Sequence, residues 1–140
     1  MLSTNTIVKE KEMYHFPTDQ SMENTKLYTD QLERTVTQFV QKLGIRPNLN
    51  GYHFLIRAIL IAFNSPDILK SLTKDLYPKI AQDYGKNVKA VECNMRRAIE
   101  SAYEYDPQRI QSVFYYKVDK PYISEVISMA VESIRYELKQ

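Results

Sequence analysis

The sequence predicts an all-α domain of about six helices that contains a helix-turn-helix module. Apolar residues recur at helical spacing along most of the chain, and no segment alternates with a period of two over a useful length. Only three glycines interrupt 140 residues, and eleven Tyr and five Phe supply large side chains for a core. A chain of this length buries roughly two-thirds of the surface that its unfolded form exposes. One helical domain with one core is therefore expected.

The chain begins with a polar segment of mixed charge that shows no sustained period. This predicts a flexible N-terminal arm at 1–28, ahead of a helical domain at 29–140. The first helix is predicted at 29–43, because apolar residues recur there at helical spacing and Gly44 follows in the position of a left-handed C-terminal cap.

Proline and glycine separate the next helices. Pro47 and Gly51 predict a loop, and a strongly apolar helix follows it. Ser65 is the expected N-cap of a further helix that begins at Pro66. Pro78 either kinks the helix around it or marks a new first turn. The helices after the first are predicted at 52–63, 66–71, 72–84, 88–104, 107–114 and 121–138.

The last long helices each carry one apolar face. In the helix from residue 88 this face holds Val91, Met95, Ala98, Ile99 and Ala102, and in the last helix it holds Ile123, Val126, Ile127, Ala130, Val131, Ile134 and Leu138. We expect the last face to close the core. The alternative is that this helix, with Met129, Tyr136 and the VFYYK segment, also forms a contact between copies bound side by side on DNA.

Charge and cysteine content limit the function classes. The net charge is only +2, but residues 70–97 hold seven basic and three acidic side chains, a positive patch of the kind that a polyanion attracts. The single cysteine, Cys93, excludes an intramolecular disulfide and a zinc site built from several cysteines. No apolar run is long enough to span a membrane, so a cytoplasmic location without membrane contact is expected.

Residues for catalysis or cofactor binding are few. His15 and His53 are the two histidines, and they have no metal-ligand or relay spacing. The three glycines are isolated, so none belongs to a phosphate-binding loop. Glu100 and Glu104 share a helical face, but no third group completes a catalytic set. The sequence predicts that the protein is not an enzyme and uses no metal or cofactor.

The remaining candidate for a functional site is the pair of predicted helices at 72–84 and 88–104. The short turn Gly85-Lys86-Asn87 joins them, and Asn87 is the expected N-cap of the second helix. In a helix-turn-helix module the second helix enters the DNA major groove. On the outward face of this second helix, Glu92 can accept a hydrogen bond from cytosine, and Arg96 or Arg97 can make a bidentate contact to guanine. The pattern alone is equally consistent with an ordinary helical hairpin whose outer face is solvated.

Four segments carry a more specific likeness: GYHFLIRAILIAF, SLTKDLYPKIAQDYG, VECNMRRAIE and KPYISEVISMAVESIRYEL. Together they resemble the C-terminal DNA-binding effector domain of the sporulation initiation response regulator of endospore-forming Firmicutes, over residues 36–138. The resemblance implies a six-helix domain that binds a short promoter box in double-stranded DNA, often as tandem copies, and that contacts RNA polymerase sigma subunits.

The resemblance also assigns roles to residues. Glu92 and Arg96 match family positions that read bases, whereas Lys86, Asn87 and Lys89 lie where the family contacts the DNA backbone.

Two positions depart from the family pattern: Cys93 replaces a base-reading arginine, and Arg97 stands in place of a histidine. Loss of such an arginine costs about 1–3 kcal/mol of discrimination at one base pair, so we expect an altered recognition sequence or weaker binding. Arg97 can offset this loss by reaching a phosphate or a neighbouring base.

The family also carries an N-terminal phosphoacceptor domain, for which the residues ahead of the first predicted helix are too few. We therefore expect a sequence-specific transcription regulator that acts without that domain. The alternative is an antagonist that pairs with a full-length relative or with polymerase and binds DNA poorly.

Overall fold

A computed structural model describes residues 19–139 and shows only helices and connecting loops in that part of the chain, which confirms the all-α prediction. The chain divides into two units, Met1–Gln31 and Leu32–Gln140. The six α-helices are α1 (Asp19–Lys42), α2 (Asn50–Asn64), α3 (Tyr77–Tyr84), α4 (Val88–Tyr105), α5 (Pro107–Gln111) and α6 (Ile123–Leu138). A 3₁₀ segment (Pro66–Lys70) and a π-helical turn (Leu72–Leu76) join α2 to α3.

The first helix differs from its prediction at the N-terminal end. It begins at Asp19 instead of Thr29, and the described side chains from Met22 to Gln31 are exposed. Most of these residues are polar, and the apolar residues among them, Met22, Leu27 and Tyr28, are exposed and do not form a core-facing stripe, so the sequence pattern did not reveal these turns. The rest of the predicted arm, residues 1–18, lies outside the described residues. Gly44 follows the helix with φ +89°, as its predicted capping position requires.

Several predicted boundaries between α2 and α4 were wrong. Gly51 lies inside α2 and not in the preceding loop, because α2 begins at Asn50. Ser65 makes no side-chain capping bond, and the stretch from Pro66 is a 3₁₀ helix. The predicted helix at 72–84 is divided, and Pro78 occupies the first turn of α3, as one of its two predicted alternatives required.

Two boundaries also move near the C-terminus. The predicted helix at 107–114 ends at Gln111, and the last helix begins at Ile123 and not at residue 121. The SVFYYKV segment, residues 112–118, is a loop without strand structure.

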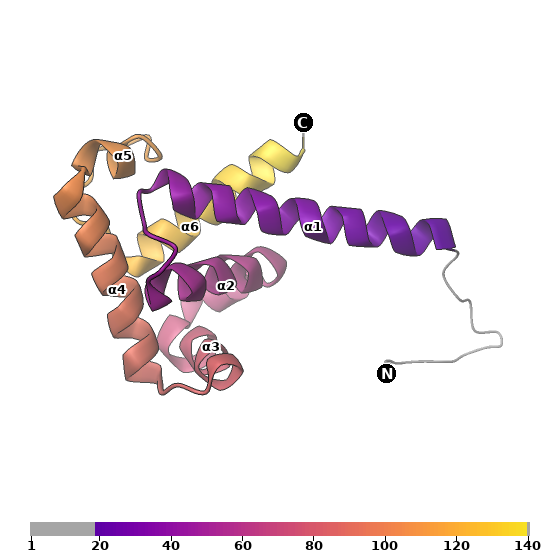
Figure 1. Ribbon diagram of the computed structural model, residues 1–140, viewed down its shortest axis with the longest axis horizontal. Coiled ribbons are helices and arrows are strands. Elements are labelled where there is room, and N and C mark those ends of the chain that lie inside the picture. The colour runs from indigo at the N-terminus through magenta and orange to yellow at the C-terminus, as the bar shows by residue number, and fades with distance from the viewer. Residues whose placement is uncertain (1–18, 140) are drawn as a thin grey trace. The chain divides into compact units, whose positions relative to one another are not determined.

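The core of the second unit is built around α2, which packs against α3, α4 and α6 (Figure 1). Gly51 explains how closely α2 and α4 approach, since a Cβ at this residue would lie 2.2 Å from the carbonyl oxygen of Asn94. The predicted apolar face of α6 is buried from Ile123 to Ile134, and only Leu138 is half-buried, so this face closes the core as expected. Met129 is also buried, at 8% exposure, and is therefore not free for a contact between copies. Among the helices that the structure describes, none is sufficiently long and apolar to cross a membrane.

Candidate DNA-binding site

The helices α3 and α4 are joined by a short turn, which is compatible with a helix-turn-helix module, and the apolar face of α4 holds this helix on the core. All five residues predicted for that face, from Val91 to Ala102, are buried. The face packs on α2 and α3. The opposite side of α4 carries mainly polar residues, as the amphipathic pattern predicts.

The turn between the two helices is determined by local backbone chemistry. Gly85 has φ +64° and ψ +37°, and the N–H of Lys86 donates to the carbonyl of Ala81 at 2.9 Å, which closes the C-terminus of α3. A Cβ at residue 85 would meet nothing within 4 Å, so the glycine serves the backbone conformation and not a close contact. The Oδ1 atom of Asn87 then accepts from the N–H of Ala90 at 2.7 Å, which confirms Asn87 as the N-cap of α4.

The structure brings the seven predicted site residues together over the turn and the outward side of α4. Five of them are exposed, whereas Glu92 and Cys93 are half-buried. Within the described part of the chain, the side chains of Lys86, Lys89 and Arg97 make no hydrogen bond or ion pair. These three cations are therefore available to an anionic partner.

Arg96 instead lies against its own helix. Its Nη1 is 3.6 Å from Oε2 of Glu92, and its Nη2 donates to Sγ of Cys93 at 3.4 Å. Both members of the ion pair are nearly half exposed, and such pairs contribute only about 0–1 kcal/mol. Arg96 can therefore leave Glu92 for another partner at little cost.

Glu92 and Arg96 lie on one flank of α4, where they line a hollow of about 380 Å³. Its other walls come from the segment before and at the start of α3 and from the start of α6, and include Leu72, Tyr77, Lys120, Pro121 and Tyr122. The sequence pattern gave no functional role to Tyr77, which stands next to Pro78 in the first turn of α3. Burial of Tyr77 raises the pKa of its hydroxyl above the ordinary 10.0, and the charge of Glu92 adds to this while Arg96 opposes it.

The wall from α6 is held in place by contacts across the preceding loop. The side chain of Gln111 donates to the carbonyl of Tyr116 at 2.8 Å and accepts from the N–H of Val118 at 3.0 Å. Lys120 pairs with Glu104 of α4 at 3.2 Å. The partners lie 5, 7 and 16 positions apart in the sequence, and no pair lies within one helix, so the spacing of residues did not indicate the contacts.

The family of the sporulation initiation factor Spo0A C-terminal domain matches residues 36–134, more than half of the chain. The chain belongs to this family. Membership implies a DNA-binding domain of a sporulation regulator, and the family is one of regulatory domains and not of enzymes. The matched region contains α2 to α5 and most of α6, and therefore both α3 and α4 with the turn between them.

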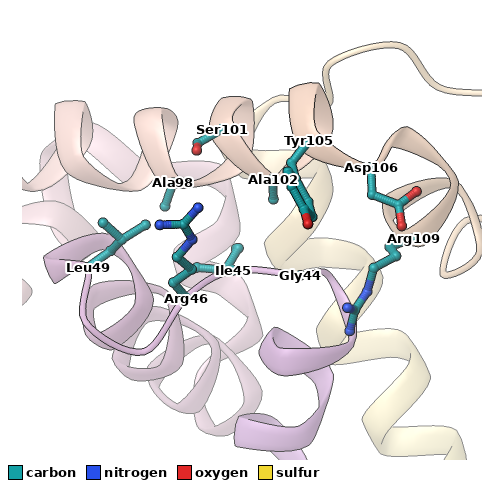
Figure 2. A pocket seen from close by; sticks show the side chains of 10 residues that line it. All are labelled: Gly44, Ile45, Arg46, Leu49, Ala98, Ser101, Ala102, Tyr105, Asp106 and Arg109. Atoms are coloured by element: carbon teal, nitrogen blue, oxygen red, sulfur yellow. The ribbon is translucent and has the colours of Figure 1, made fainter.

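A second hollow, of about 190 Å³, lies on the other flank of α4 and has a different character. Figure 2 shows the guanidinium of Arg46 beneath Ala98 and Ser101, and that of Arg109 turned toward the chain near Gly44. Arg109 donates to the carbonyl of Gln41 at 3.0 Å and so satisfies one of the last carbonyls of α1. Arg109 therefore has a structural role, and none of the seven predicted site residues lines this hollow.

Proposed function

We propose that this chain is a sequence-specific DNA-binding transcription regulator whose helix α4 enters the major groove of double-stranded DNA. The observation that carries the proposal is the outward side of α4 and its turn, which present Lys86, Lys89, Arg96 and Arg97 as exposed cations. A family of DNA-binding regulatory domains that matches this same region supports it. Residues near the start of such a helix meet base edges, and neighbouring cations meet phosphates.

The proposal divides the site residues into two groups. Glu92 and Arg96 read bases, and Lys86, Asn87 and Lys89 contact the backbone. The Oδ1 atom of Asn87 is occupied by the N–H of Ala90, so its contribution to DNA is the amide NH₂ group. Cys93 and Arg97 belong to neither group. They give this chain a recognition sequence different from that of relatives that have arginine and histidine at these positions.

A titration of duplex DNA at two salt concentrations tests the proposal. The preferred duplex is first selected from a randomised library and then compared with a scrambled duplex of equal length. Specific binding keeps its preference as salt rises, because base contacts specify while phosphate contacts supply the salt-sensitive affinity. Equal and steeply salt-dependent binding to every duplex would refute the proposal. The 140-residue chain should bind without a phosphoryl donor.

Two variants separate the roles. Arg96→Ala should reduce affinity for the preferred duplex by about 1–3 kcal/mol and leave scrambled DNA almost unaffected. Lys89→Ala should weaken all duplexes alike and lower the salt slope by about 1. If Arg96→Ala binds every sequence as well as the unmodified chain, the outward side of α4 is not the side in the groove.

We also propose that residues 29–140 carry the DNA-binding activity, that copies bind side by side on tandem boxes, and that the bound domain contacts an RNA polymerase sigma subunit. Tyr115 and Tyr136 are 84% and 70% exposed, so they offer aromatic surface for contacts between proteins. Because the proposed DNA-binding domain begins at residue 29, removal of residues 1–28 should preserve binding to a single box.

A further inference from the structure

The hollow beside α4 is lined by a buried tyrosine, Tyr77, whose hydroxyl has no hydrogen-bond partner among the described residues. Tyr77 is only 5% exposed, and among the residues that the structure describes its hydroxyl makes no hydrogen bond. Buried polar groups are nearly always hydrogen-bonded, because an unmade bond leaves the cost of desolvation uncompensated. Such a group indicates that the hydroxyl gains its partner in another state of the protein.

The surroundings of the hydroxyl indicate which partner this is. Glu92 and Arg96 line the same hollow, as does Glu100. A tyrosine hydroxyl with the ordinary pKa of 10.0 keeps its proton at neutral pH, and burial raises the pKa of Tyr77 further, so this hydroxyl can donate a hydrogen bond. Because the charge of Glu92 contributes to this shift, Glu92 is the acceptor favoured over Glu100.

DNA binding would remove the present partner of Glu92, the guanidinium of Arg96. Without DNA, Arg96 lies 3.6 Å from the Glu92 carboxylate. When Arg96 turns to a base, that carboxylate loses its cation while it faces a polyanion. The other cation in the hollow, Lys120, is already paired with Glu104 at 3.2 Å.

We propose that Tyr77 is a positioning residue for DNA recognition: when Arg96 leaves Glu92 for the DNA, the Tyr77 hydroxyl donates to the Glu92 carboxylate and holds it toward its base. This inference rests on the proposed function of α4. Tyr77 contacts no DNA itself, since it is buried beneath the helix. Its contribution is to base discrimination and not to phosphate binding.

Tyr77→Phe tests the inference, because it removes only the hydroxyl. We expect discrimination between the preferred duplex and duplexes changed at single base pairs to fall roughly tenfold at the position read by Glu92. Affinity for scrambled DNA should not change, and Tm should stay the same or rise, because an unpartnered buried hydroxyl is lost. Tyr84→Phe, which removes a hydroxyl from the half-exposed end of the same helix, should match the unmodified chain.

A double-mutant cycle with Glu92→Gln shows whether Tyr77 acts through Glu92. In the Glu92→Gln background, Tyr77→Phe should change discrimination little, since the pair acts as one unit. Additive effects, unchanged discrimination in Tyr77→Phe, or an equal loss of affinity for all duplexes would each overturn the inference while the proposed function stands. If the unmodified chain itself selects no sequence, the proposed function fails, and the inference fails with it.

Discussion

Replacement of Gly51 by Ala tests the contact that places α4. A Cβ at residue 51 would lie 2.2 Å from the carbonyl oxygen of Asn94 and 2.7 Å from the Cβ of Ala98. Neither atom can rotate away, so α2 has to move off α4. Overpacking a core costs about 1–3 kcal/mol and occasionally more, and the depth of this overlap places Gly51→Ala at about 3 kcal/mol or above.

The expected loss is large enough for a simple thermal unfolding assay followed by circular dichroism. For a chain of this length, each kcal/mol lowers Tm by roughly 3–4 °C, so Gly51→Ala should lower Tm by about 10 °C. Intrinsic helix propensity acts in the opposite direction, since Ala is favoured over Gly by about 0.5–1 kcal/mol within a helix. A fall in Tm therefore reports the contact with α4.

Gly85→Ala provides the matched control. A Cβ at residue 85 meets nothing within 4 Å, and the cost there comes only from φ +64°, at about 1–2 kcal/mol. Gly51→Ala should therefore be clearly the less stable variant. If it loses no more stability than Gly85→Ala, or gains stability, the close approach of α2 and α4 is refuted.

Three further predictions follow from the site. Asn87→Ala should lower the free energy of unfolding by about 1 kcal/mol in a urea titration, whereas Asn87→Ser should retain most of the stability because serine also caps helices. Equal losses in the two variants would contradict a capping role. The raised pKa of Tyr77 favours its protonated form in the folded state, so this stability is present below its ordinary pKa of 10.0 and is lost as pH rises through the folded-state value. Tyr77→Phe should therefore flatten the decline of Tm above pH 10.0, and an unchanged decline would argue against it. A duplex with two boxes should fill cooperatively while ultracentrifugation shows a monomer without DNA, and independent filling or a DNA-free dimer would exclude tandem contact.

Local chemistry explains the features that the sequence determined. The buried face of α4 follows from apolar residues at helical spacing, the turn before it from the left-handed backbone of Gly85, and its first turn from the cap by Asn87. Each depends on residues a few positions apart, so each can be predicted from the sequence before the tertiary partners are known. The outward position of Arg96 and Arg97 follows from the same periodicity.

Tertiary structure decided what depends on a distant partner. Gly51 was predicted in a loop, and only the packing of Asn94 of α4 against it shows its role. Arg109 carries no signal in the sequence, and only its bond to the carbonyl of Gln41 shows its role. The sequence pattern gave no role to Tyr77, and only the packing of α4 and the start of α6 around it places it in a hollow that Glu92 also lines. These partners lie many residues away, and the spacing of apolar residues carries no information about which polar atoms meet across a packed interface.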